Sequence, residues 1–210
     1  MIKTREQLIT ENRELHARLV EIAMTSVAER AKLRWSFRNL RGVIHNELLS
    51  ASQDSDLIIF GKTGHSGRRR TGSTARHLIT HSDIHSLVLR QRLHPNSSVF
   101  LIYDGSEASE RALWTTRLIS APDTQIRILL VTPEVAQARE FQTHIQSLLD
   151  EVLSQATFNR IETLDKVDLV HIARLQGCGV IVIPAEIGSE THSSLVELVD
   201  KADCAVLLTR

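Results

Sequence analysis

The stretch that decides the fold reads DLIIFGKTGHSG and spans residues 56–67. Its first part, Leu57 to Phe60, is apolar at every position and has the length of a strand, which indicates a strand buried on both faces. A loop rich in glycine and arginine follows, then a helical segment from about Ser73 to Ile79 and a second strand from Ser86 to Arg90. A strand, a helix and a strand in this order predict a parallel sheet that helices cover on both faces.

The same alternation restarts after the polar, proline-containing break at residues 94–98. Further strands are predicted at 99–103, 126–131, 160–164, 180–183 and 205–208, and helices at 106–120, 133–156, 168–176 and between the last two strands.

The two halves of the chain resemble each other. Residues 56–60 parallel 179–183, and residues 82–90 parallel 202–210. We therefore predict an internal repeat of one α/β unit, in which the first copy, residues 1–93, lacks its front, and the second, residues 97–210, is complete.

The N-terminal region from Thr4 to about Arg30 contains no glycine or proline, and its apolar residues recur at helical spacing. This pattern predicts an amphipathic helix that covers a sheet or, alternatively, forms the stem of a helical dimer. Residues Leu33 to Leu40 alternate apolar with polar, which predicts a half-exposed strand, and a helix is expected from Val43 to Ser52.

Composition excludes several classes of protein. The chain is 42% apolar and 24% charged, which is enough to build a core, and its formal net charge is zero, which argues against general nucleic-acid binding. The polar N-terminus lacks a signal peptide, and no apolar run is long enough to span a membrane, so we expect a cytoplasmic protein without membrane insertion. The two cysteines, Cys178 and Cys204, are expected to be small core residues.

Two segments closely resemble the universal stress protein family. The first is residues 56–73 with the helix and strand after it, which looks like the back half of a universal stress protein domain. The second is residues 99–113, with Asp104-Gly105-Ser106 after the strand, which looks like its opening strand and helix. The resemblance implies two such units with parallel sheets flanked by helices, the first unit lacking its opening strands. The last strands of the units, Leu87 to Leu89 and Val206 to Leu208, would then meet.

The resemblance also implies a nucleotide site. In nucleotide-binding members, a carboxylate after the first strand contacts the adenine nucleoside, and a glycine loop after the fourth strand wraps the phosphates. Glycines let the backbone approach the anion, and amides at the helix start complement its charge. The candidate positions in this chain are Gly61, Lys62, Gly64, His65, Gly72, Ser73 and Asp104. The candidate ligand is an adenine nucleotide, ATP with magnesium.

The two halves of that motif belong to different units. The first unit has the glycine loop, two residues shorter than the family pattern between Gly64 and Gly72, but no equivalent of Asp104. After its fourth strand the second unit reads PAEIGSE, where Glu186 and Glu190 would repel a triphosphate. We therefore expect weak anion or nucleotide binding at the first loop and none in the second unit.

Simpler interpretations of these residues stay open. Asp104-Gly105-Ser106 also suits a turn and helix cap, and the arginine run 68–70 also suits a solvated loop. The Gly61-Lys62 pair lacks the upstream glycine of a P-loop. His77, His81 and His85 have metal-binding spacing only on a continuous helix, which is expected to end near His81.

The sequence contains no pairing of nucleophile and base to indicate catalysis. The leading hypothesis is therefore a non-enzymatic stress-response binding or interaction module, and the main alternative is an ATP-binding regulatory switch with slow or no hydrolysis. A hydrolase or transferase on a related fold ranks last. The missing strands leave a gap that Leu33 to Leu40 could fill by pairing with Leu57 to Phe60. A partner subunit could fill it instead, by self-association or as another protein, or this part stays loose.

Overall fold

The computed structural model describes residues 5–63, 70–90, 98–149, 156–164, 178–186 and 192–210. It divides into two compact units, residues 1–43 and 44–210, which are described one by one.

The first unit is dominated by helix α1, Arg5–Ala31. The helix ends where Lys32 adopts a positive φ of 53° and the N–H of Leu33 donates to the carbonyl of Ala28 at 2.9 Å, a Schellman-type end. Its large apolar side chains between residues 15 and 27 are largely exposed, as the 66% exposure of Ile22 illustrates. Both roles expected for this helix, covering a sheet or forming a dimer stem, stay predictions.

The strand predicted from Leu33 to Leu40 is wrong, because residues 33–41 have no regular secondary structure. A strand needs a neighbour to accept and donate its backbone hydrogen bonds, and alternation of polarity alone does not supply one. The expected pairing of this segment with Leu57 to Phe60 is therefore wrong as well.

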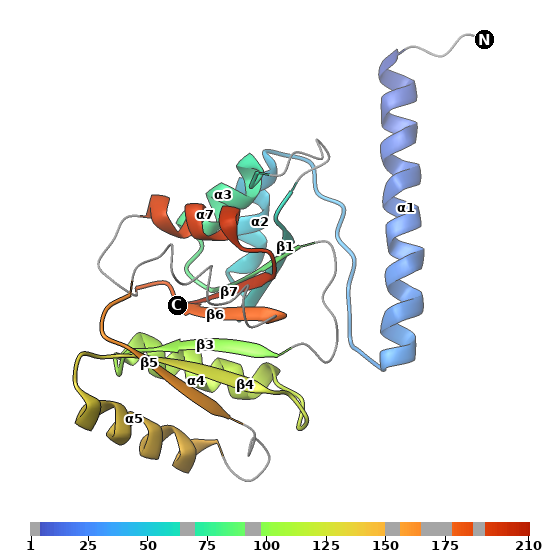
Figure 1. Cartoon of the computed structure of the whole chain (residues 1–210). Helices are drawn as coiled ribbons and strands as arrows, with labels where there is room; N and C mark the ends of the chain where they lie inside the picture. The colour runs from blue at the N-terminus through green and yellow to red at the C-terminus, as the bar shows by residue number, and fades with distance from the viewer. Residues whose placement is uncertain (1–4, 64–69, 91–97, 150–155, 165–177, 187–191) are drawn as a thin grey trace. The chain divides into compact units, whose positions relative to one another are not determined.

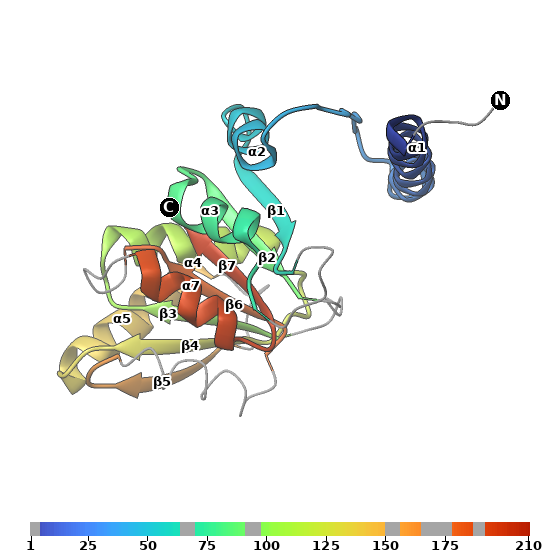
Figure 2. The same ribbon diagram turned by 90° about the horizontal axis from the view of Figure 1, so that it is seen from above.

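The second unit is built on one seven-stranded sheet, in the order β1-β2-β7-β6-β3-β4-β5. Figure 2 shows β1 and β5 at its two edges. The strands are β1 Leu57–Gly61, β2 His85–Leu89, β3 Val99–Tyr103, β4 Ile126–Val131, β5 Thr157–Ile161, β6 Val180–Pro184 and β7 Ala205–Thr209. Neighbouring strands are parallel except β2 and β7.

The antiparallel contact between β2 and β7 joins the two halves of the sheet. Leu87 lies opposite Leu207, with Val88 opposite Val206, so these two strands meet as the family resemblance implied. The sheet is continuous from one half to the other, and the predicted boundary at residues 94–98 falls almost wholly on residues 91–97, outside the described part.

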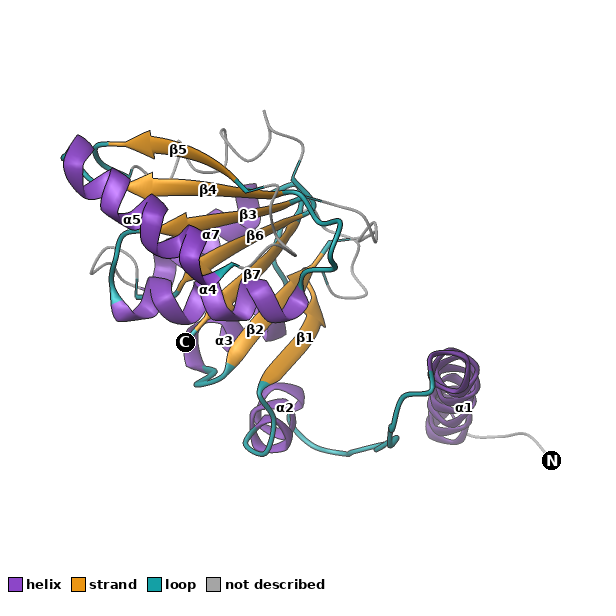
Figure 3. Cartoon of the chain, turned by 90° about the horizontal axis from the view of Figure 1, so that it is seen from below, coloured by secondary structure: helices purple, strands orange, loops and turns teal. Residues whose placement is uncertain are grey.

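Helices cover both faces of this sheet (Figure 1). Helices α3 and α7 pack on one face and α4 and α5 on the other, which Figure 3 shows from below, while α2 packs against α3. Their bounds are α2 Ile44–Ser52, α3 Ser73–His81, α4 Glu107–Ile119, α5 Val135–Leu148 and α7 His192–Lys201.

Two expected elements differ in extent from the observed ones. Helix α5 ends at Leu148 rather than near Ala156, and the strand expected at 160–164 is β5, Thr157–Ile161. The helix expected at 168–176 lies outside the described residues. Strands β3, β6 and β7 are buried at every position, as their apolar sequences predicted. The burial on both faces predicted for Leu57 to Phe60 is wrong, because β1 is an edge strand and none of its residues is buried. The α/β fold class, a mostly parallel sheet flanked by helices, is confirmed; the absence of opening strands from the first repeat stays a prediction.

Candidate functional site

The predicted glycine loop begins at the end of β1 and returns to the start of α3. Gly61 is the last residue of β1, Ser73 is the first residue of α3, and Gly72 is its N-cap, without a side-chain cap bond. The N–H of Gly72 donates to the carbonyl of Lys62 at 2.9 Å and closes the base of the loop. Four predicted site residues thus lie together, while Gly64 and His65 fall outside the described residues.

The side chain of Lys62 points to the end of helix α7. It is only 7% exposed, and its ammonium donates to the carbonyls of Asp200 at 2.8 Å and Ala202 at 3.4 Å. The last carbonyls of a helix lack intrahelical partners and carry its negative dipole end, so a buried cation is stable there. The charge expected to attract phosphate is therefore engaged by α7.

An internal carboxylate lies beside the start of α3. Asp200, in the last turn of α7, accepts hydrogen bonds from the backbone N–H of Thr71 at 2.6 Å and from the Thr71 hydroxyl. The guanidinium of Arg76 lies 3.4 Å from its other oxygen. Burial alone would raise the pKa of Asp200, but the two bonds from Thr71 and the nearby cations hold that pKa below its usual value. Asp200 is thus an anion, next to a helix start that favours anions.

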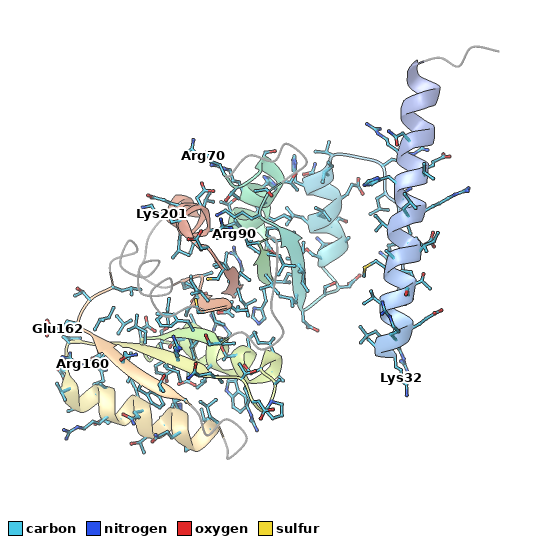
Figure 4. All side chains as sticks on the ribbon, turned by 45° about the vertical axis from the view of Figure 1, so that its right-hand side comes forward. Lys32, Arg70, Arg90, Arg160, Glu162 and Lys201 are labelled. Atoms are coloured by element: carbon cyan, nitrogen blue, oxygen red, sulfur yellow. The ribbon has the colours of Figure 1, made fainter. Side chains whose placement is uncertain are left out.

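Of the basic run after the glycines, Arg70 is described. Its side chain is exposed, and Figure 4 shows it projecting away from the sheet. Arg68 and Arg69 lie outside the described residues.

Asp104, the predicted adenine contact, lies directly after β3 and forms a turn. Its carboxylate accepts from the backbone N–H of Ser106 at 3.0 Å and from the hydroxyl of Ser106 at 2.5 Å. The oxygen of that hydroxyl in turn accepts from the N–H of Ser109 at 3.2 Å and caps α4. Gly105 between them has a φ of +80°, which other residues rarely adopt. These contacts match the turn-and-cap interpretation of Asp104-Gly105-Ser106.

A second group of hydrogen-bonded side chains begins at Tyr103, the residue before this turn. The hydroxyl of Tyr103 donates to Glu110, and His144 lies 2.9 Å from the same carboxylate. Burial, and then the bond to Glu110, raise the pKa of Tyr103 far above its ordinary value. The phenol is therefore a fixed donor rather than a proton carrier near neutral pH.

The segment after β6 is where the second predicted repeat, residues 97–210, would hold its own phosphate loop. The N–H of Ala185 donates to the carbonyl of Thr209 at 2.9 Å, and the carboxylate of Glu186 pairs with Arg111 of α4 at 3.2 Å. Gly188, Ser189 and Glu190 lie outside the described residues.

The glycine loop and Asp104 lie at opposite ends of the sheet. The loop follows the carboxyl end of β1, and Asp104 follows the carboxyl end of β3. Because β2 and β7 are antiparallel, the strands of the two halves point in opposite directions. The two parts of the predicted motif therefore do not converge on one ligand.

The three histidines at four-residue spacing do not share one helix. His77 and His81 stack on α3 with ring centroids 4.1 Å apart, whereas His85 begins β2 and accepts at Nδ1 from the N–H of Arg210 at 3.0 Å. Across the described part of the chain, no group of three or more His, Cys, Asp or Glu side chains could hold a metal ion.

Asp200 was not predicted from the sequence. It is 129 residues from Thr71 and is one of many acidic residues on predicted helices. Only the packing of α7 beside α3 brings the two together.

In the part of the chain that the structure describes, no helix is both long and apolar enough to cross a membrane. No family model matches the sequence, and no curated protein matches it.

Solved structures do match the fold. A universal stress protein from Archaeoglobus fulgidus DSM 4304 superposes with a TM-score of 0.72 at 13% identity, over 100% of this chain and 80% of its own. A Pseudomonas aeruginosa UCBPP-PA14 protein assigned to the universal stress proteins gives 0.61 at 13% identity, over 99% and 90%. A protein of unknown function from Pseudomonas aeruginosa PAO1 gives 0.57 at 11% identity, over 100% and 89%. With its mostly parallel sheet covered by helices on both faces, the chain has the universal stress protein fold.

Proposed function

We propose that this protein is a non-enzymatic stress-response binding and interaction module that works without a nucleotide in its glycine loop. The observation that carries this proposal is the carboxylate of Asp200, which accepts both donors of Thr71 at the start of α3. That position is where the loop would otherwise receive a phosphate.

The electrostatics around the loop support the same conclusion. A phosphate approaching the start of α3 meets the charge of Asp200, and like charges in a partly buried site repel. Lys62, the cation at the start of the loop, is buried against the carbonyls of α7. The carboxylate of Asp104, which would contact the nucleoside, holds a turn at the other end of the sheet.

The alternative, an ATP-binding regulatory switch, has one feature in its favour. Gly72 provides no side-chain cap for α3, and a helix start capped by glycine can accept a ligand oxygen. In that case the nucleotide displaces Asp200 from Thr71, and binding moves α7.

The interaction role draws support from β1, an edge strand of the sheet. It is apolar from Leu57 to Phe60, yet none of its residues is buried and Ile59 is 56% exposed. Its sequence contains no Lys or Pro, the residues that usually protect an edge strand from pairing. A strand of this composition suits a position with neighbours on both sides.

A second copy of this chain fits that edge. The N–H of Lys62 donates to Leu89 of β2, and backbone groups alternate in direction along a strand, so Leu57, Ile59 and Gly61 direct theirs outward. Two copies related by a twofold axis would pair β1 antiparallel, with Ile59 opposite its own equivalent and Leu57 opposite Gly61. These are hydrogen-bonded pairs in register, so the edge is complementary to itself.

Calorimetric titration tests the nucleotide part of the proposal. ATP and AMP, each with magnesium, are titrated into the wild-type protein and into the Gly64→Val and Asp200→Asn variants, and phosphate release is followed in parallel. We expect no heat from the wild type up to millimolar nucleotide. Micromolar binding that disappears in Gly64→Val would overturn the proposal and establish the switch. Nucleotide binding by Asp200→Asn but not by the wild type would confirm that the Asp200 carboxylate excludes the phosphate.

Sedimentation of the chain over a range of concentrations tests the self-association. We expect a dimer in the wild type and a monomer in Ile59→Lys, because a charged side chain at the centre of the paired edge blocks pairing. Leu118→Lys is the matched control, since Leu118 is an apolar residue on α4 that is already 83% exposed. A monomeric wild type, or equal dimers in both variants, would refute pairing through β1.

A further inference from the structure

The only two cysteines of the chain are in contact at one end of the sheet. Cys178 lies two residues before β6 and Cys204 directly before β7, and these strands are parallel neighbours. The two sulfur atoms are 3.4 Å apart. A disulfide requires about 2.05 Å, so a small shift of the two side chains would close the bond.

The backbone around both cysteines is fixed by the sheet. The N–H of Gly179, next to Cys178, donates to the carbonyl of Ser98 at 2.8 Å. The N–H of Ala205, next to Cys204, donates to the carbonyl of Gly179 at 3.1 Å. The separation of the sulfurs therefore follows from the ladder of hydrogen bonds rather than from two flexible loops.

The two thiols differ in acidity. The hydrogen bond between the two sulfurs lowers the pKa of Cys178, and the positive charge of Arg127 acts in the same direction against the effect of burial. The same hydrogen bond and burial raise the pKa of Cys204. Because the thiolate is the nucleophile in thiol chemistry, Cys178 is the more reactive of the two.

Neither a metal site nor a purely structural pair accounts for these features. Two sulfurs are too few for a structural zinc site, and the described residues place no further metal ligand with them. Cysteines retained only for packing are usually fully buried, whereas both of these are partly exposed.

We propose that Cys178 and Cys204 form a peroxide-reactive dithiol that closes to an intramolecular disulfide. The Cys178 thiolate attacks one oxygen of a hydroperoxide; the O–O bond breaks and the sulfur becomes a sulfenic acid. The other oxygen leaves as hydroxide or alkoxide and takes up the proton that the Cys178 thiol released, which gives water or alcohol. The sulfur of Cys204 then attacks Cys178, loses its proton to the departing hydroxyl and releases water. The two sulfurs together supply the two electrons that reduce the peroxide. A small thiol reductant restores the dithiol by exchange.

The site lies at the same end of the sheet as the glycine loop. Because β7 is antiparallel to β2, its amino end is next to the carboxyl end of β2, where Arg90 pairs with Asp203. Ala202 is two positions before Cys204, and its carbonyl accepts a hydrogen bond from the ammonium of Lys62. The dithiol thus lies next to the segment that anchors the loop.

Mass spectrometry of the full chain tests the proposal. The protein is treated with a small excess of hydrogen peroxide, remaining thiols are alkylated, and tryptic peptides are analysed. We expect a chain lighter by two hydrogen atoms, a cross-linked pair of peptides containing Cys178 and Cys204, and complete reversal by dithiothreitol. Retention of two alkylatable thiols, or cross-links between chains in place of the internal one, would overturn the proposal.

Single serine variants then distinguish the roles of the two sulfurs. In Cys204→Ser we expect a sulfenic acid on Cys178 that dimedone traps, and in Cys178→Ser an initial oxidation rate at least about tenfold lower, as thiolate chemistry requires. Equal rates in both variants would refute the assignment of Cys178 as the attacking thiol. Alkylation of the wild-type protein tests the same assignment without a substitution. Cys178 should react before Cys204 in the folded protein, and the two thiols should react at equal rates after unfolding.

Discussion

Removing the carboxylate of Asp200 should strongly destabilise the compact unit of residues 44–210. In Asp200→Ala, the N–H and the hydroxyl of Thr71 lose an ionised acceptor whose side chain is only 19% exposed. A hydrogen bond to a charged group contributes about 1.5–3 kcal/mol, whereas the half-exposed pair with Arg76 contributes about 1 kcal/mol at most. Allowing for water that reaches the exposed part of the site, we expect a loss of about 3–4 kcal/mol in the free energy of unfolding. Asp200→Asn keeps a carbonyl acceptor for Thr71 and should lose only about 1 kcal/mol.

Urea unfolding followed by circular dichroism measures the loss in both variants. Its dependence on pH separates the contribution of the Asp200 charge from that of the side chain's shape. Burial would raise the pKa of Asp200, but the bonds from Thr71 hold it below the ordinary value. A lowered folded-state pKa stabilises the protein above the ordinary pKa of aspartate, near 4, and this contribution disappears as pH falls through the folded-state pKa. The difference in the free energy of unfolding between wild type and Asp200→Asn should therefore have its full value at neutral pH and decrease at acidic pH. A difference that is independent of pH, or a loss below about 1 kcal/mol in Asp200→Ala, would refute this account.

Three further outcomes are expected. Gly105→Ala should lower the free energy of unfolding by about 2–4 kcal/mol, because the backbone there has a φ of +80° and a Cβ would lie 2.4 Å from the ring of Phe141. Gly61→Ala is the control, since its Cβ would meet nothing closer than 3.7 Å, and it should lose under about 1 kcal/mol in the same unfolding experiment. Burial, with a hydrogen-bonded carboxylate, raises the pKa of Tyr103, the single tyrosine, so its phenolate absorbance should develop only above the ordinary pKa in the folded protein and at that pKa in denaturant. Oxidation of the two cysteines, 26 residues apart, should stabilise the fold by about 3.5 kcal/mol from loop closure and raise the melting temperature by about 10 °C; an unchanged melting temperature after verified disulfide formation would contradict it.

The sequence predicted the elements of the sheet well, for a clear physical reason. Strands with helices on both faces must be apolar at every position, and Val99–Tyr103, Val180–Pro184 and Ala205–Thr209 are buried throughout. The contact between β2 and β7 was implied by the family resemblance, which placed Leu87 to Leu89 against Val206 to Leu208. Local pattern is sufficient for the strands, and the resemblance supplied their contact.

Features that depend on pairing across the chain could not be read from the sequence. Alternation from Leu33 to Leu40 favoured a strand, but no local signal shows whether a neighbour exists to accept its hydrogen bonds. The contact of Asp200 with Thr71 and that of Cys178 with Cys204 arise only from the packing of α7 on α3 and of β6 beside β7. Their residue types gave no specific signal, because carboxylates on helices and cysteines in apolar runs are common.

The topology explains why a glycine loop can be present without a complete nucleotide site. Parallel strands bring together the segments that follow their carboxyl ends, so Asp104 can share a ligand only with segments at its own end of the sheet, such as the one that follows β6. That segment begins with Ala185 and Glu186, the latter paired to Arg111, rather than with glycines. The loop from Gly61 to Ser73 lies at the other end, and the antiparallel contact of β2 with β7 keeps it there. No change within that loop could therefore bring it to Asp104. A nucleotide site of the family type would have to be formed by the segment that follows β6. The loop from Gly61 to Ser73 is instead fixed by the contacts of Lys62 and Asp200, as part of the packing between α3 and α7.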